Sequence, residues 1–198
     1  CGSDNVSMVG ELLPTTSPEL ADCFMGGLDI AISNKNLKTV EYLTTHLSGK
    51  QFTDLMKRDI IVDDMEMFKP LHVLYCERAS YDSQYKLIGN LAERGKIDQF
   101  KMILDLLMNE TPPVVFDTYG TLAAEIGRLY SVGNRVLYDE LKRRGVLMKE
   151  LDQWKSFFNF MLLNKGLTFE DIWSVFMDIP CGVYQNTMLI NRWKAYFL

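Results

Sequence analysis

The chain has 198 residues, 47% of them hydrophobic and 24% charged, and it carries 21 Lys and Arg against 26 Asp and Glu, for a formal net charge of −5. This composition excludes a disordered chain, and the length is enough for one domain with a real core. The acidic balance argues against nucleic acid as the main partner, because phosphate binding needs a basic surface. Two histidines leave little room for His-based catalysis or a His-rich metal site.

The N-terminal stretch differs in character from the rest of the chain. Residues 1–5 are polar, and the residues that follow carry turn signals, including Pro14 and Pro18, with no Lys or Arg up to residue 20. We therefore expect residues 1–20 to form a tether that precedes the folded part.

Helical periodicity dominates beyond the tether, because apolar residues recur at spacings of three and four. Gly49 is expected to end one helix, and Pro70 is expected to open another, since proline is favoured in the first turn. The runs 60–62 and 114–116 are expected to be extended. The other helices are expected at 28–34, 37–47, 51–58, 85–94, 97–108, 121–130, 135–144, 150–164, 168–178 and 184–197.

The helices come in short pairs, which indicates internal repeats. The segments AISNKNLKTVEYLTTHL, AERGKIDQFKMILDLL and LYSVGNRVLYDELKRRG each hold a helix end, a short turn and a second helix with leucines. Their turn residues Lys35, Gly95 and Gly133 are 60 and 38 residues apart. One pair alone has an apolar face too small to make a core, whereas stacked neighbours bury a continuous one.

These segments resemble the second half of an ankyrin repeat. Pro70-Leu71-His72 resembles the start of one, where the family motif reads Thr-Pro-Leu-His and Lys69 here replaces the Thr. The resemblance covers roughly residues 24–146, and the repeats are degenerate because the family period is about 33 residues, so that the interval of 60 could hold two. It implies a solenoid of stacked antiparallel helix pairs, in which the His72 imidazole hydrogen-bonds neighbouring turns.

We therefore expect an all-α protein in three parts. Residues 1–20 form the tether, residues 21–148 the ankyrin-like helical repeats, and residues 149–198 a helical cap on the last pair. The cap is rich in aromatic residues, most of them expected in the core: Trp154, Phe157, Phe158, Phe160, Trp173, Phe176, Tyr184, Trp193, Tyr196 and Phe197.

Cys1 resembles the mature start of a bacterial lipoprotein, in which a signal peptide is cut immediately before a lipid-bearing cysteine. Each buried CH₂ contributes roughly 0.8 kcal/mol, so several acyl chains on one cysteine anchor firmly. Gly2 in place of Asp resembles the sorting signal for the outer membrane in Gram-negative lipoproteins. The resemblance implies lipid attachment at Cys1 and a location on the periplasmic face of the outer membrane. The alternative is a fragment whose first residue happens to be cysteine.

The sequence carries no recognisable catalytic or metal-binding motif. GxSxG, HExxH, the P-loop and GxGxxG are all missing. No two of Cys23, Cys76 and Cys181 form a CxxC pair, and at most one disulfide could join them. We expect no enzymatic activity, no cofactor and no metal site. Arg143 and Arg144 are expected only to complement the dipole of the helix that they end.

The most acidic short run is residues 63–68, DDMEMF. It could be a solvated loop; a calcium site is disfavoured because the run lacks the oxygen spacing and the glycine of an EF-hand. It could also be an acidic lip with apolar anchors for a basic partner, where ankyrin proteins place their protruding finger. The equivalent stretch before a later helix pair is 115–119. The candidate protein-binding residues are Asp63, Asp64, Glu66, Met67, Phe68, Asp117 and Tyr119.

Three functions remain open. Small lipoproteins of this kind resemble the immunity proteins that bacteria pair with secreted antibacterial effectors, including the lipases of type VI secretion. The resemblance implies a lipid-anchored inhibitor of a periplasm-acting toxin such as a phospholipase, although fold does not by itself give function. The alternatives are an envelope scaffold or assembly factor, and an enzyme without a recognisable motif.

Overall fold

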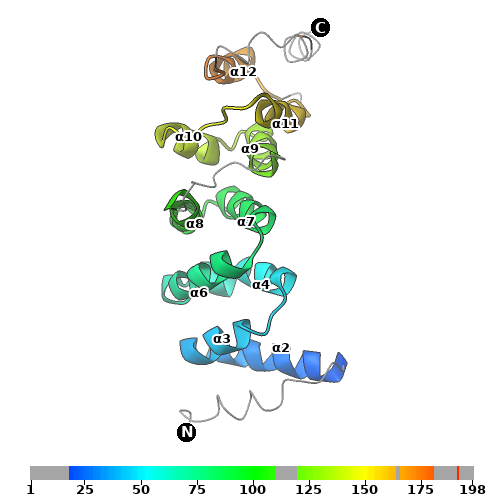
Figure 1. The fold of residues 1–198 in the computed structure, drawn as a ribbon, viewed down its shortest axis with the longest axis vertical. Coiled ribbons are helices and arrows are strands. Elements are labelled where there is room, and N and C mark those ends of the chain that lie inside the picture. The colour runs from blue at the N-terminus through cyan, green and yellow to red at the C-terminus, as the bar shows by residue number, and fades with distance from the viewer. Residues whose placement is uncertain (1–17, 110–119, 164–165, 181–190, 192–198) are drawn as a thin grey trace. The chain divides into compact units, whose positions relative to one another are not determined.

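The computed structural model of the chain describes residues 18–109, 120–163, 166–180 and 191, with side chains from residue 24 onward (Figure 1). This part of the chain forms eleven helices and no strand, which confirms the all-α expectation. The chain divides into two compact units, Cys1–Ala79 and Ser80–Leu198. The two units are described separately below.

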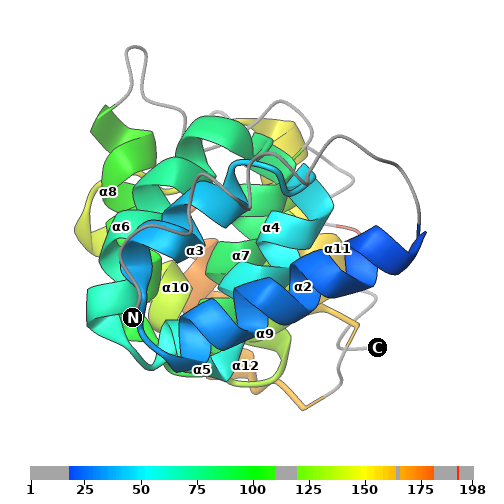
Figure 2. The same ribbon diagram turned by 90° about the horizontal axis from the view of Figure 1, so that it is seen from below.

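In the first unit, residues 18–79 form two longer and three shorter helices. α2 packs against α3, and α4 packs against α6, with α3 and α6 also in contact (Figure 2). The interval of 60 residues between two of the expected turns therefore contains a further helix pair. The bounds are α2 (Pro18–Ser33), α3 (Leu37–Thr44), α4 (Gly49–Met56), α5 (Asp59–Val62) and α6 (Met65–Arg78).

Three parts of the first unit differ from expectation, and side-chain caps explain two of them. Gly49 begins α4 instead of ending the preceding helix, because Ser48 and Gln51 form a reciprocal capping box. α5 is one helical turn, so residues 60–62 are not extended. α6 begins at Met65, capped by Asp64, so Pro70 lies inside the helix and does not open it.

The first unit is closed by Arg78, at the end of α6. Its guanidinium donates hydrogen bonds to the main-chain oxygens of Thr44, Thr45 (2.9 Å) and Leu47 (3.0 Å), where α3 ends. Carbonyls at and beyond the end of a helix need such donors from outside the helix. The same guanidinium lies over the ring of Phe52, 5.7 Å from its centroid. One side chain thus joins the end of α6 to the end of α3 and the start of α4.

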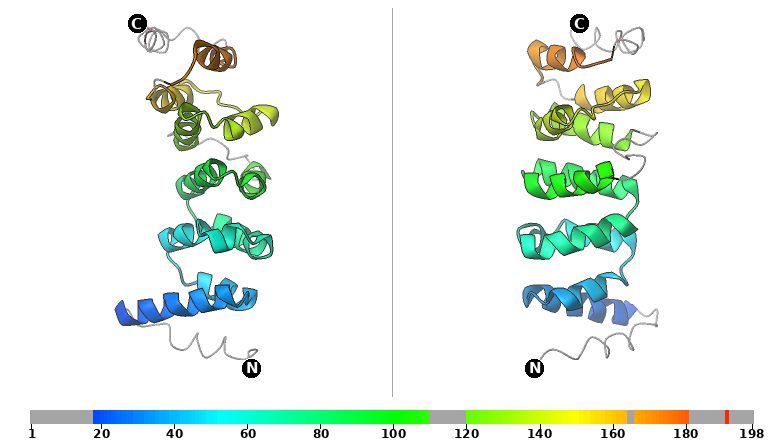
Figure 3. Two further views of the ribbon diagram at one scale, coloured as in Figure 1. Left: turned by 180° about the vertical axis from the view of Figure 1, so that it is seen from behind. Right: turned by 60° about the vertical axis from the view of Figure 1, so that its left-hand side comes forward.

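The second unit contains six described helices. α7 packs against both α8 and α9, and α9 packs in turn against α10 and α11 (Figure 3). The first helices of successive pairs, α7, α9 and α11, therefore form one row. The bounds are α7 (Tyr81–Glu93), α8 (Ile97–Asn109), α9 (Thr121–Ser131), α10 (Val136–Arg143), α11 (Leu151–Met161) and α12 (Phe169–Phe176).

Three helix pairs share one kind of turn. Lys35, Gly95 and Gly133 have φ values of 53°, 70° and 81°. In each turn the next amide hydrogen-bonds to a carbonyl five residues earlier, at 2.9, 2.8 and 3.0 Å, as in a Schellman motif. These are the three positions that the repeat search aligned. Glycine takes this backbone conformation without steric cost, whereas Lys35 takes it at a penalty.

The core of the second unit is built where α9 meets α11. Trp154, Phe157, Tyr130 and Tyr138 are buried, and the rings of Phe157 and Tyr130 meet edge-to-face with centroids 5.9 Å apart. Such aromatic pairs add to the free energy gained from burial alone. Gly127 of α9 makes the approach possible, because a Cβ there would lie 2.2 Å from the main-chain oxygen of Phe157.

Candidate protein-binding surface

The acidic run 63–68 is not a loop. Asp63 ends α5, Asp64 caps α6, and residues 66–68 belong to the first turns of α6. Met67 and Phe68 are 4% and 0% exposed, so the expectation that they anchor a partner is wrong. With Leu71 and Tyr75 they form the buried face of α6, at the spacing that a helix needs to face a core.

Asp64 has structural partners that occupy its carboxylate. Its Oδ1 accepts hydrogen bonds from the amides of Glu66 (3.0 Å) and Met67 (3.3 Å), and its Oδ2 lies 2.7 Å from the Lys35 ammonium. The hydrogen bond from Lys35 is the main cause of a lowered pKa of Asp64. Lys35 occupies the turn between α2 and α3, so this ion pair ties the first helix pair to α6.

Replacing Asp64 with alanine is expected to lower the melting temperature by roughly 2–4 °C, because α6 loses its side-chain cap. Asp64→Asn keeps the acceptor and loses only the ion pair, so it should retain most of the stability. Thermal unfolding followed by circular dichroism measures both. Equal losses from the two substitutions would contradict the capping role.

His72 is buried on α6, and its imidazole interacts within that helix. Its Nδ1 hydrogen-bonds to the main-chain oxygen of Lys69, and its ring stacks on Phe68 with centroids 5.9 Å apart. Burial lowers the pKa of His72, which favours the neutral imidazole. The partner is therefore a carbonyl of the same helix, and not a neighbouring turn as the ankyrin resemblance implied.

The excess negative charge lies mostly outside the described side chains. Residues 1–23 contain four Asp and Glu and no Lys or Arg, which accounts for four of the five net charges. The remainder of the chain carries 21 Lys and Arg against 22 Asp and Glu, so it is nearly neutral. Cys1, Asp117 and Tyr119 also lie outside the described residues.

A groove between α3 and α6 is a candidate binding surface of the first unit. Its volume is about 470 Å³, within the range of ligand and peptide pockets. The contributing side chains follow one face of each helix, at spacings of three and four. They are Lys38, Glu41, Tyr42 and Thr45 of α3 and its cap, and Pro70, Val73 and Leu74 of α6.

Apolar side chains form the floor of this groove and charges form its rim. Val73 is 40% exposed and Tyr42 is half-buried, which leaves apolar surface open to a partner. Lys38 and Glu41 stand one turn apart on α3, and no ion pair joins either to another described side chain. This arrangement suits an amphipathic helix of a partner, whose apolar stripe would fill the floor.

Aromatic rings extend the groove toward α2. Tyr42 meets His46 edge-to-face with centroids 5.2 Å apart, and His46 meets Phe24 of α2 at 6.5 Å. Tyrosine and similar rings are enriched in binding surfaces because they offer large contact area at low entropic cost. Sequence reasoning missed this surface, although the apolar Val73 and Leu74 beside the buried positions of α6 are a signal for it.

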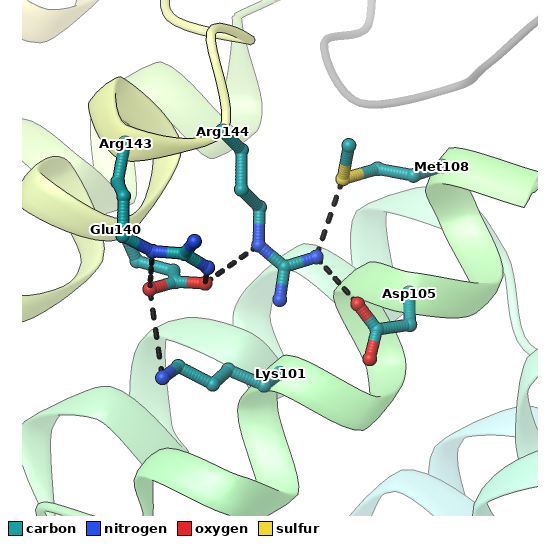
Figure 4. Close-up of polar contacts among 6 residues, drawn as sticks. All are labelled: Lys101, Asp105, Met108, Glu140, Arg143 and Arg144. Atoms are coloured by element: carbon teal, nitrogen blue, oxygen red, sulfur yellow. Dashed lines mark hydrogen bonds and ion pairs between the residues drawn. The ribbon is translucent and has the colours of Figure 1, made fainter.

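A second polar centre joins α8 and α10 in the second unit (Figure 4). Glu140 is 7% exposed and binds Arg143 and Arg144, each at 2.6 Å, and Lys101 at 3.5 Å. The hydrogen bonds from Arg143 and then Arg144 lower the pKa of Glu140 to about 2, against the opposing effect of burial. Arg144 also pairs with Asp105. The arrangement is an ion-pair network between helices.

Among the side chains that the structure describes, no group of three or more His, Cys, Asp or Glu is placed to hold a metal ion. Cys76 lies half-buried on α6. No described helix is long and apolar enough to cross a membrane.

Comparison with family models, with curated proteins and with solved structures finds no match to the chain.

Proposed function

We propose that this chain is a protein-binding module, and specifically an immunity protein that binds and neutralises a periplasm-acting toxin such as a secreted phospholipase. The α3–α6 groove carries the proposal, because it combines an open apolar floor with charges at its rim. Attachment to the periplasmic face of the outer membrane through Cys1 is part of the same proposal. It rests on the sequence alone.

An ankyrin-like solenoid is the arrangement that we propose for the helix pairs. The repeated turn at Lys35, Gly95 and Gly133 supports it, as does the row formed by α7, α9 and α11. Solenoids of this kind present extended surfaces to other proteins. The alternative function, an envelope scaffold or assembly factor, would use the same groove for a resident partner.

Val73→Lys is expected to weaken partner binding at least tenfold, because it places a charge on the apolar floor of the groove. Val73 is already partly exposed, so the fold should tolerate the change. The full-length protein is first used to isolate the partner from the producing cell. The dissociation constant of the complex is then measured by calorimetry.

Val132→Lys is the matched control, because Val132 is an exposed valine of the second unit and does not line the groove. It should bind as the unchanged protein does. Unchanged affinity of Val73→Lys would exclude the groove. Inhibition of a secreted hydrolase by the protein would support the immunity function, whereas an envelope-resident partner without toxic activity would support the scaffold.

A further inference from the structure

One face of α12 contacts α9 and α10, which belong to the same unit. The hydroxyl of Tyr130 on α9 hydrogen-bonds to the main-chain oxygen of Asp171 at 3.2 Å. After the end of α12, Asp178 accepts hydrogen bonds from the hydroxyl of Tyr138 (2.8 Å) and from Lys142 (2.7 Å), both on α10. Asp171, Ser174 and Asp178 therefore mark the side of this segment that faces α9 and α10.

The opposite side of α12 carries a ladder of aromatic rings. Phe169 stacks on Trp173 with centroids 5.8 Å apart and planes 14° apart, and Trp173 stacks on Phe176 at 5.8 Å and 21°. At about 100° per residue, these three rings point away from the docking side. Phe169 and Trp173 remain 50% and 43% exposed. The ladder is thus an apolar surface at the end of the unit.

The spacing of the ladder recurs 20 residues later in the sequence. Phe169, Trp173, Phe176 and Met177 are matched by Leu189, Trp193, Tyr196 and Phe197. Both sets would follow one face of a helix. Leu189 follows Met177 closely in the sequence, so the second stripe starts near the end of the first.

The charges that flank the two stripes are complementary. Glu170 stands beside the ladder, whereas Arg192 and Lys194 stand beside the second stripe. The terminal element of a stack of helix pairs also needs a covering element with a polar outer face. A segment with one aromatic side and basic flanks has the composition of such a cover.

We propose that the C-terminal segment, residues 184–197, docks on the aromatic ladder of α12 through Trp193, Tyr196 and Phe197. The occupant of this surface is therefore a part of the same chain, and an external partner binds elsewhere. The inference is independent of the function proposed for the α3–α6 groove.

A double-mutant cycle in the full-length chain tests the proposal. Trp173→Ala and Trp193→Ala should each lower the melting temperature by roughly 4–8 °C. The double variant should be little worse than the more damaging single one, because both substitutions remove the same contact. Phe160→Ala, at an exposed aromatic position on α11, is the control and should combine additively with Trp193→Ala.

Iodide quenching of tryptophan fluorescence provides a second readout that does not depend on stability. In the Trp193→Phe variant, the fully buried Trp154 is shielded, so Trp173 is the tryptophan that iodide reaches. Adding Tyr196→Ala and Phe197→Ala should increase the quenching constant of Trp173 at least twofold. Additive melting shifts in the cycle, or a quenching constant that does not change, would overturn the proposal and leave the ladder to an external partner.

Discussion

Gly127→Ala is expected to destabilise the protein by about 3 kcal/mol and to lower the melting temperature by roughly 6–12 °C. The added Cβ would lie 2.2 Å from the main-chain oxygen of Phe157. A main-chain atom cannot move aside as a flexible side chain can, so α9 and α11 would have to separate. Separation would open the buried contacts around Trp154 and Tyr130. Thermal unfolding measured by calorimetry gives the size of the effect.

Substitutions at two other glycines serve as controls for this prediction. At Gly27, in α2, a Cβ would meet nothing within 4 Å, so Gly27→Ala should be neutral or stabilising, because alanine favours helix. At Gly89 the nearest atom is the Glu125 carboxylate, at 2.6 Å, which can rotate away. Gly89→Ala should therefore cost less than Gly127→Ala. A Gly127→Ala variant as stable as Gly27→Ala would show that α9 and α11 do not approach as described.

Glu140→Gln is expected to destabilise the protein by about 3 kcal/mol, the lower end of the range for breaking a buried ion pair. The substitution removes the buried one of the two carboxylates that pair with Arg144, whose side chain is 12% exposed. Urea unfolding at pH 7 measures the loss. Asp105→Asn is the matched control: its side chain is 58% exposed, so losing its ion pair with Arg144 should cost less than about 1 kcal/mol.

The pH dependence separates an ionic role of Glu140 from a packing role. Its pKa is about 2 in the folded protein and 4.5 as the ordinary value, so the unfolded state binds the proton more readily between these values. Its contribution to stability is therefore complete above about pH 4.5 and is lost as the pH falls toward 2. In Glu140→Gln this part of the acid dependence should disappear. An unchanged acid profile would contradict the ionic role.

Apolar spacing predicted the fold class and most helix positions. The helices expected at 97–108, 121–130 and 135–144 agree with α8, α9 and α10 to within one or two residues. The glycine turns at Gly95 and Gly133 were also found, because the left-handed conformation restricts the residue type. These features depend on neighbours in the sequence, so local reasoning reaches them.

The errors arise where a residue was interpreted without its neighbours, or where helices from separate parts of the sequence meet. Gly49 and Pro70 were interpreted by residue type alone, whereas the side-chain caps at Ser48 and Asp64 set the helix starts. Arg143 and Arg144 were assigned to the helix dipole, whereas both bind the buried Glu140 one turn earlier. The α3–α6 groove combines two helices from separate parts of the sequence, so the apolar positions of α6 alone could not locate it.

The position of Arg78 bears on the order in which the first unit is completed during synthesis. The ribosome releases the chain from its N-terminus, and domains generally fold as units. The carbonyls of Thr45 and Leu47 receive their donor only when residue 78, the penultimate residue of the unit, has emerged. The end of the nascent α3 therefore lacks the hydrogen bonds from Arg78 until some thirty further residues have been added. We therefore expect the first unit to close only after its last helix has been synthesised.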